Sequence, residues 1–317
     1  MKPGAAVVGL GVGEAHARTY ASLGCPLWLH DHDRERAVRL AAELNAQVAE
    51  SYQQILDSVE VRIVSVASYD QDHFRQTVAA LDAGKHVFCE KPLCRSLDEL
   101  RAVKRAWQRT AGQLASNLVL RAHPLYQWQD YEFGSLYAID GDYLYGRLRK
   151  ITEGWRAATD GYSVMLGGGI HLADQMLLLA GERPLTVSAQ GSKIVTRYTA
   201  FRYRDYITAT YTFGSGLVGR ISANFGAAHP HQHVLRAFGT QGTFLHDDSG
   251  ARFYRGSGRP EHLGGFAPSK AALIPAFVLE VVSGANADPQ HEFDLISVCV
   301  AADASVDRQR PVRIEYV

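Results

Sequence analysis

The segment GKHVFCEKPLC, residues 84–94, brings a lysine to the end of an apolar strand. Its apolar core, residues 87–89, is followed directly by Glu90, Lys91 and Pro92. A residue before proline favours extended backbone, so Lys91 cannot simply continue into a helix. Ligands of open α/β sheets bind outside the carboxyl ends of the strands, where an ammonium group can stabilise a developing negative charge. The alternative is that Glu90 and Lys91 merely begin a loop.

A glycine turn near the N-terminus is the second candidate for chemistry. The sequence GLGVGE places Gly9, Gly11, Val12 and Gly13 at an expected strand-to-helix junction, where backbone amides can approach a pyrophosphate. The third glycine stands one residue earlier than in the usual fingerprint. Asp31 follows the next expected strand, where a carboxylate can accept hydrogen bonds from ribose hydroxyls and repel a 2′-phosphate. The pattern predicts a dinucleotide site that prefers NAD to NADP, and an ordinary βα turn is the alternative.

The segment LGGGIHLADQMLLLAG contains a histidine and an acid that are three residues apart. If residues 170–179 form a helix, His171 and Asp174 lie on one face of it, and Asp174 can orient the imidazole. Imidazole titrates near neutral pH, so His171 can exchange a proton with a hydroxyl. The alternative is a structural histidine beside a glycine-rich turn.

The first third of the chain alternates between short apolar runs and helical spacing. Strands are expected at residues 5–10, 27–30, 61–67, 86–89 and 114–120, and helices at 15–23, 34–44, 73–83 and after Ser96. Ser96 and Glu99 form a capping box at the start of the last helix. This alternation predicts a Rossmann-type α/β domain over residues 1–120, with a doubly wound parallel sheet covered on both faces.

After about residue 122 the pattern changes to strands joined by glycine-bearing turns. Strands are expected at residues 136–145, 186–189, 206–213, 217–225, 234–238 and 243–246, and helices at 170–179 and 277–282. We expect an antiparallel meander. Residues 121–317 are therefore predicted to form an α+β domain with a large, mostly antiparallel open sheet.

The composition excludes several classes of protein. The chain has 317 residues, 46% of them hydrophobic, which favours two domains. Its 33 basic and 33 acidic residues balance, and no basic stripe predicts a nucleic-acid partner. No apolar run approaches a membrane span, and no signal peptide precedes the first expected strand. The four scattered cysteines suit a reducing compartment, so we expect a cytoplasmic protein.

Five segments, in chain order, resemble the glucose–fructose oxidoreductase, inositol dehydrogenase and rhizopine-catabolism family (Gfo/Idh/MocA). They read VASYDQDHFRQTVAAL, AGKHVFCEKPL, LGGGIHLADQMLLLAG, YITATYTFGSGLVGRISANF and RPVRIEYV. The resemblance spans essentially the whole chain. It implies NAD(P)-dependent oxidation or reduction of a secondary alcohol, commonly on a sugar or cyclitol ring.

The resemblance also implies roles for particular residues. Lys91 matches the family's catalytic lysine, His171 its general base or acid, and Asp174 the acid of the same motif. The family often carries an aspartate four residues before the histidine, and here that position is Gly167. Either the proton relay is shorter, or another group orients the histidine.

Further residues are expected to contact the ligands. In addition to the glycine turn and Asp31, the resemblance places Ser68, His73 and Glu90 at the cofactor. Arg156 and Tyr162, in a glycine-bearing loop before the histidine motif, are expected to bind the substrate together with the catalytic lysine and histidine. A guanidinium such as that of Arg156 can bind a phosphate through two hydrogen bonds. Surface residues on a loop are the alternative.

Five other polar residues have weaker signals. Arg121 and His123 follow the last strand of the first domain and are expected at the domain junction. His229, His231 and His233 alternate, so they share one face if they lie on a strand. We expect that face to be solvated or an interface. A metal site is the less favoured reading, because no carboxylate or cysteine completes a ligand set.

The preferred substrate is a nucleotide-activated sugar such as UDP-N-acetylglucosamine, oxidised at its ring 3-position. A free-sugar or inositol dehydrogenase is the alternative enzyme. A non-catalytic dinucleotide sensor that regulates a partner is the alternative from another class, although a sensor needs neither the lysine nor the histidine. The family commonly associates through its sheet, so a homodimer or homotetramer formed by the C-terminal sheet is expected.

Overall fold

The structure is a computed structural model that describes residues 2–110, 112–285 and 287–317, and the chain folds into two compact units. Unit 1 comprises Met1–Ala122, Pro268–Phe293 and Val317, and unit 2 comprises His123–Ala267 and Asp294–Tyr316. The sequence predicts a domain boundary after residue 120, and this boundary stays a prediction. Residues 268–293 return to the first unit, which no local pattern in the sequence predicted.

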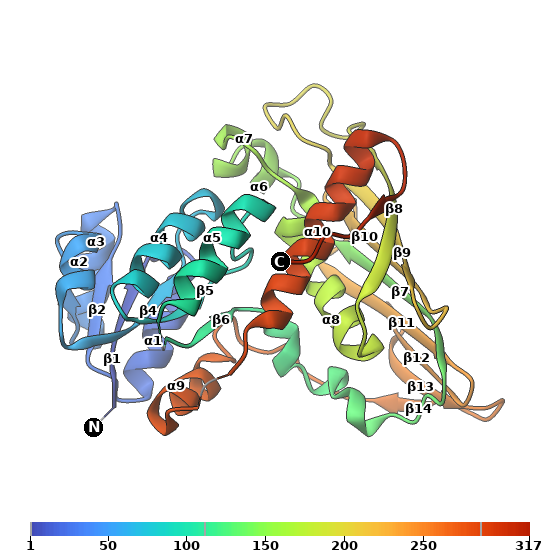
Figure 1. Ribbon diagram of the computed structural model, residues 1–317, viewed down its shortest axis with the longest axis horizontal. Coiled ribbons are helices and arrows are strands. Elements are labelled where there is room, and N and C mark those ends of the chain that lie inside the picture. Colours follow the sequence, from blue (N-terminus) through green and yellow to red (C-terminus); the bar gives the residue numbers. More distant parts are fainter. Residues whose placement is uncertain (1, 111, 286) are drawn as a thin grey trace. The chain divides into compact units, whose positions relative to one another are not determined.

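Unit 1 is built on a parallel sheet of six strands in the order β3-β2-β1-β4-β5-β6 (Figure 1). The strands are β1 (Gly4–Val8), β2 (Leu27–His30), β3 (Gln47–Val48), β4 (Val61–Val66), β5 (His86–Cys89) and β6 (Leu114–Ser116). Every residue of β1 is buried, as expected of a central strand covered on both faces. The predicted Rossmann-type doubly wound sheet is confirmed.

The helices of unit 1 are α1 (Gly13–Ser22), α2 (Arg34–Leu44), α3 (Tyr52–Asp57), α4 (Asp70–Asp82), α5 (Leu97–Gln108) and α9 (Ile274–Ser283). The predicted cap at Ser96 is confirmed, because Ser96 Oγ accepts a bond from Glu99 N (3.2 Å). The return bond of the capping box differs from the prediction: Glu99 Oε2 accepts from Arg95 N (2.7 Å), one residue before the N-cap. Helix α4 begins three residues earlier than predicted, with Asp70 and Asp72 favourably placed in its first turn.

Helix α9 was predicted in the second domain but packs in unit 1. Its apolar residues Ile274, Phe277 and Val281 join the core formed by α1, α2 and one face of the sheet. The rings of Phe277 and Phe88 lie 5.3 Å apart. Local spacing shows that a helix has an apolar side, but it does not show which sheet that side covers.

Unit 2 is built on a nine-stranded sheet in the order β14-β13-β12-β11-β7-β10-β9-β8-β15. The strands are β7 (Leu136–Leu144), β8 (Pro184–Ser192), β9 (Tyr206–Phe213), β10 (Val218–Asn224), β11 (Gln232–Gly239), β12 (Gly242–Asp247), β13 (Gly250–Arg255), β14 (Glu261–Leu263) and β15 (Val312–Arg313). The sheet is mostly antiparallel, as predicted, but β7 and β10 pair in parallel, so it is not a simple meander. Strands β13 and β14 were not predicted.

One face of this sheet is covered by α8 (Ile170–Ala180) and α10 (Gln290–Arg308), as Figure 1 shows. Gly141 allows the close approach of α8 to β7, because a Cβ there would lie 3.1 Å from Leu172 Cβ. The short helices α6 (Arg149–Thr152) and α7 (Trp155–Ala158) precede α8, and so does a π-helical turn, η4 (Met165–Gly169). Within the described ranges, no helix is both long and apolar enough to cross a membrane.

Candidate active site

The glycine turn of unit 1 depends on two close backbone approaches. Gly9 has a φ of 85°, and a Cβ there would lie 2.6 Å from the carbonyl oxygen of Ala67. Gly13 begins α1, and a Cβ there would lie 2.9 Å from Val7 Cγ1 and from Ala67 Cβ. Although the third glycine stands one position early in the sequence, it still allows the close packing of helix on strand that the fingerprint requires.

The same turn leaves room for a dinucleotide. A Cβ at Gly11 would meet no atom within 4 Å, so the backbone there faces open space. The N-cap residue Val12 provides no side-chain cap to α1, which leaves amide groups at this helix end for an anion. These residues fit the pyrophosphate of a dinucleotide.

Asp31 connects the glycine turn to the end of β2. Its side chain is only 2% exposed; Oδ2 accepts a bond from Leu10 N (2.5 Å) and Oδ1 accepts one from Asp33 N (2.8 Å). His32 Nδ1 lies 3.0 Å from the same Oδ1. Asp31 therefore orders the turn itself, and its contact with a ribose stays a prediction.

Glu90 is buried under the strand end that carries Lys91. Its Oε1 accepts a hydrogen bond from Asn117 Nδ2 (2.6 Å) and lies 3.1 Å from His16 Nε2. His16 Nδ1 in turn lies 2.9 Å from Ser65 Oγ. Neither His16 nor Asn117 was predicted from the sequence as a site residue. One feature of the sequence could have indicated a role for His16: it lies in the first turn of the helix that follows the glycine turn.

The Glu90 carboxyl is held in its ionised form. Burial by itself would raise its pKa, but the hydrogen bond and charge of His16, the charge of Lys91 and the Asn117 amide outweigh burial and lower it. Lys91 is half-buried at the carboxyl end of β5. A fixed negative charge therefore stands beside the lysine that the sequence analysis singled out.

The buried ring of His73 contacts the backbone of two loops, one after β4 and one after β5. The ring is 1% exposed, with Nδ1 2.7 Å from the carbonyl oxygen of Pro92 and Nε2 3.2 Å from that of Ser68. Burial lowers its pKa, but the neighbouring Cys89, the Asp70 charge and the Pro92 carbonyl raise it to about 10. The ring then donates through both nitrogens. We propose that His73 shapes the loops around a cofactor, and its direct contact with the dinucleotide stays a prediction.

His171 lies in the first turn of α8 in unit 2, directly after the π-helical turn. It is 8% exposed, and its ring centroid lies 6.3 Å from that of Tyr143 and 5.6 Å from that of His233. Burial and the neighbouring His231 lower the pKa of His233 to about 3, so this imidazole is neutral. His171 therefore has a neutral ring at its side.

Asp174 lies one turn further along α8 and is fully buried. Gln175 Nε2 lies 3.4 Å from Asp174 Oδ2, and Trp128 Nε1 donates to Gln175 Oε1 (3.0 Å). The predicted helix is confirmed by α8. A direct role of Asp174 in orienting His171 stays a prediction.

Tyr162 occupies the space above Gly167. A Cβ at Gly167 would lie 2.2 Å from Tyr162 Oη, so no side chain fits at position 167 while Tyr162 holds this place. Arg156 Nε donates to the same hydroxyl (3.0 Å), and its guanidinium lies 4.4 Å from the Trp155 ring centroid. The two loop residues expected at the substrate thus meet over the turn that leads to His171.

The other polar residues are divided between the units. Arg121 pairs with Glu292 (2.6 Å) in unit 1. His123 packs in unit 2 against Tyr126, with ring centroids 5.0 Å apart. Their place at a domain junction stays a prediction.

The three alternating histidines do not act as a set. Strand β11 begins at Gln232, so His229 and His231 precede it and only His233 lies on it. The rings of His231 and His233 lie 5.0 Å apart. In the parts of the chain that the structure covers, no group of three or more His, Cys, Asp or Glu residues is arranged to hold a metal ion.

Comparison with protein families identifies the class. Residues 4–118 match the model of the Gfo/Idh/MocA oxidoreductase family with an NAD-binding Rossmann fold, and residues 128–245 match the C-terminal domain of the same family. The chain belongs to the Gfo/Idh/MocA family, and it is an oxidoreductase with NAD as its cofactor.

Two curated relatives have similar sequences. The chain is 29% identical over 230 residues to UDP-N-acetylglucosamine 3-dehydrogenase of Acidithiobacillus ferrooxidans, covering 72% of this chain and 69% of the relative. It is 26% identical over 239 residues to D-glucoside 3-dehydrogenase of Escherichia coli, covering 68% and 66%. The matched part thus spans about two thirds of each relative.

Solved structures share the fold over the whole chain. Myo-inositol 2-dehydrogenase from Lactobacillus plantarum superposes with a TM-score of 0.85 at 20% identity, over 99% of this chain and 100% of that one. Levoglucosan dehydrogenase in complex with NADH superposes with a TM-score of 0.86 at 18% identity, over 100% of both chains.

Substitutions at two glycines of the turn, Gly9 and Gly11, should have different effects on stability and on cofactor binding. Gly9→Ala forces a Cβ into the backbone of the β4–α4 loop at a positive φ, so we expect a loss of about 1–3 kcal/mol in the free energy of unfolding. Gly11→Ala should change stability by less than about 0.5 kcal/mol but weaken NADH binding. Denaturant unfolding and NADH fluorescence titration measure both. Equal stability of the two variants would contradict this account of the turn.

The ionised Glu90 predicts a pH dependence of stability. Because its pKa is lower in the folded chain, its contribution is present above the ordinary carboxyl value and is lost as pH falls through the folded value. Glu90→Gln should therefore be less stable than the natural chain near neutral pH, and the difference should shrink below about pH 4. Denaturant unfolding across this range is the measurement. A difference independent of pH would mean that the carboxyl is not held ionised.

The contact between Gly167 and Tyr162 predicts a coupling between two substitutions. Gly167→Ala alone should destabilise the chain by about 1–3 kcal/mol, because its methyl group overlaps the tyrosine hydroxyl. In a Tyr162→Ala background the same change should cost much less, so a double-mutant cycle should give a clear interaction energy. Additive costs would show that the two residues do not compete for one space.

Proposed function

We propose that this chain is an NAD-dependent dehydrogenase that oxidises a secondary hydroxyl of a sugar or polyol. NAD, when bound, supplies the acceptor for the hydride that leaves the carbinol carbon. The protein must then accept the hydroxyl proton and stabilise the oxygen from which it departs. The names of the relatives support the substrate class, because they describe dehydrogenases of sugars, glucosides and inositol.

The position of Lys91 is the main observation that supports this proposal. It stands at the carboxyl end of β5 in the NAD-binding unit, the edge where open α/β sheets bind their ligands. Glu90 beside it is ionised and held by His16 and Asn117, so the strand end is fixed when a substrate arrives. We propose that the Lys91 ammonium stabilises the developing alkoxide by an electrostatic effect that needs no rearrangement.

His171 is the proposed acid–base group. It lies at the start of α8, is largely buried, and has the neutral His233 ring beside it. A neutral neighbour adds no positive charge that would oppose protonation of His171, so the ring can accept the hydroxyl proton. In this proposal Tyr162 and Arg156 bind the substrate from the loop before the π-helical turn.

For the substrate itself we propose a nucleotide-activated sugar, such as UDP-N-acetylglucosamine, oxidised at the ring 3-position. The relative at 29% identity, with matches to both halves of this chain, supports this choice. The glucoside and inositol relatives support a free sugar or polyol as the second candidate. Reduction of NAD followed across a panel of both substrate classes distinguishes them. Tight NADH binding with no turnover across the whole panel would favour a dinucleotide sensor instead.

The role of Lys91 predicts a separation of turnover from cofactor binding. Lys91→Ala should lower kcat by roughly two to three orders of magnitude, because a fixed cation is lost at the reacting oxygen. The affinity for NADH should stay nearly unchanged. Steady-state kinetics and NADH fluorescence titration measure the two quantities.

Lys150→Ala is the matched control, since Lys150 is an exposed lysine of α6. It should leave both quantities unchanged. If Lys91→Ala instead weakened NADH binding as much as it slowed turnover, the lysine would be a cofactor ligand and the proposed role would be wrong.

A further inference from the structure

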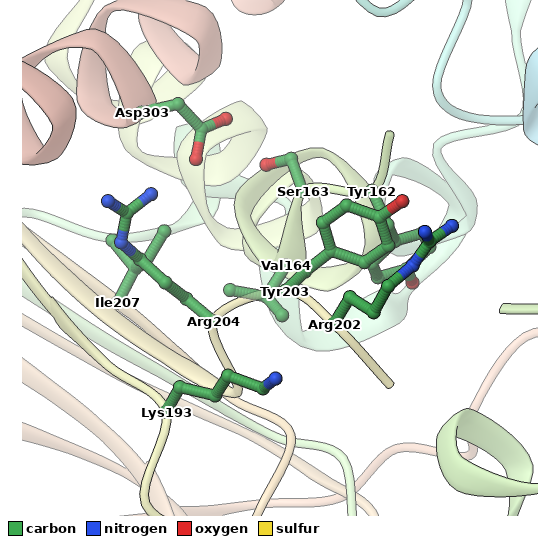
Figure 2. A pocket seen from close by; sticks show the side chains of 9 residues that line it. All are labelled: Tyr162, Ser163, Val164, Lys193, Arg202, Tyr203, Arg204, Ile207 and Asp303. Carbon is green, nitrogen blue, oxygen red and sulfur yellow. The ribbon is translucent and has the colours of Figure 1, made fainter. Parts of the chain in front are cut away.

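A cationic cavity lies in unit 2 beside the segment that precedes α8. It has a volume of about 330 Å³ and opens between the β8–β9 connection, residues 162–164 and α10. Figure 2 shows Lys193 on the opposite side from Asp303 and Ser163. A volume of this size is at the lower end of small-molecule sites.

Positive charge dominates the lining. Lys193, Arg202 and Arg204 line the cavity, and Asp303 is the only acid among its lining residues. Arg204 is paired with Asp307 (2.7 Å). For Lys193 and Arg202, the structure as described gives no ion pair and no side-chain hydrogen bond. Two cations are therefore left to attract an anion from solution.

The β8–β9 connection is held in place before any ligand arrives. Asp205, which is 1% exposed and is not among the lining residues, accepts bonds at Oδ2 from Thr196 N (2.7 Å) and Thr196 Oγ1 (2.9 Å). Phe201 is fully buried. Tyr203 Oη donates to the carbonyl oxygen of Thr159 (2.7 Å). An ordered loop loses less conformational entropy on binding than a mobile one.

Asp303, the one acidic residue of the cavity lining, does not prevent an anion from binding in the cavity. Burial raises the pKa of Asp303 to about 7, although the Ser163 hydrogen bond and Arg204 act against this effect. With a pKa near neutral pH, this carboxyl can take up a proton when an anion binds beside it, and the protonated form offers a hydroxyl donor. Ser163 and the two tyrosines of the lining supply further hydroxyl groups.

The cavity shares a wall with the proposed reaction site. Tyr162 lines the cavity, and its hydroxyl lies against Gly167, which precedes His171 by one turn. Tyr162 therefore belongs both to the cavity lining and to the surroundings of the turn that leads to His171. A ligand that joins a sugar ring to a diphosphate has a sugar part and an anionic part close enough together for two neighbouring sites.

We propose that this cavity is a binding site for a phosphate-type anion, and that it receives the diphosphate of a nucleotide-activated sugar. The second half of this statement rests on the proposed function. The same cationic side chains would also bind free pyrophosphate as an effector. The experiment therefore has two arms, one for free pyrophosphate and one for the diphosphate of a nucleotide sugar.

The test compares the natural chain with two variants: a double variant that lacks two cations of the cavity, and a single control variant that lacks one cation outside it. Lys193→Gln with Arg202→Gln removes the two available cations, and Arg197→Gln removes an exposed charge of the same loop that does not line the cavity. In the first arm, calorimetry measures pyrophosphate binding. We expect binding to the natural chain and to Arg197→Gln, and a loss of about 10- to 100-fold in the double variant. Unfolding midpoints check that all three proteins fold.

In the second arm, kinetics measure KM and kcat for UDP-N-acetylglucosamine and for a free sugar. The double variant should raise KM for the nucleotide sugar by a similar factor, with kcat and the free-sugar KM unchanged. Pyrophosphate binding without turnover of nucleotide sugars would keep the anion site and reject the proposed substrate. Turnover of nucleotide sugars with equal KM in all proteins, and no pyrophosphate binding, would overturn the cavity proposal and leave the function standing.

Discussion

The buried carboxylate of Glu90 joins several elements of the NAD-binding unit, and the position of the neighbouring Lys91 depends on it. A charge inside a protein is tolerated only when it is paired and hydrogen-bonded. Here His16 of α1 and Asn117, which follows β6, both reach Oε1, and Ser65 of β4 contacts the far nitrogen of the histidine. One carboxylate thereby fixes the end of β5 relative to its neighbours, and the residue that follows it is Lys91.

Unit 2 relies on a steric constraint in place of a charge. The π-helical turn Met165–Gly169 is entirely buried, and its glycines allow aromatic rings to lie directly on the backbone. Tyr162 covers Gly167, and a Cβ at Gly168 would lie 2.2 Å from Tyr143 Cε1. The Tyr143 ring also lies beside the ring of His171, and Tyr162 lines the cationic cavity. The family's usual aspartate has no space at position 167, so another group must take over any role it has.

Charge is organised differently on the two faces of the large sheet. The covered face carries neutral imidazole and aromatic rings, such as His233 and Tyr143. The other face carries ion pairs, in which Arg220 binds Asp140 and Asp142 at 2.8 Å each. Association through this sheet, which the sequence analysis expected, would therefore meet paired charges and not a purely apolar surface.

Local patterns in the sequence determined most of the parallel sheet, the Ser96 cap of α5, helix α8 and the places of Lys91 and His171 in the chain. These features depend on residues close in sequence, whose periodicity and turn chemistry can be read directly. Only the tertiary structure decided that α9 packs on the first core, that β7 pairs with β10, that His16 and Asn117 hold Glu90, and that Lys193 and Arg202 line one cavity with Asp303. Each of these unites residues far apart in the chain, and no local spacing specifies such contacts, because they arise from packing between complete elements.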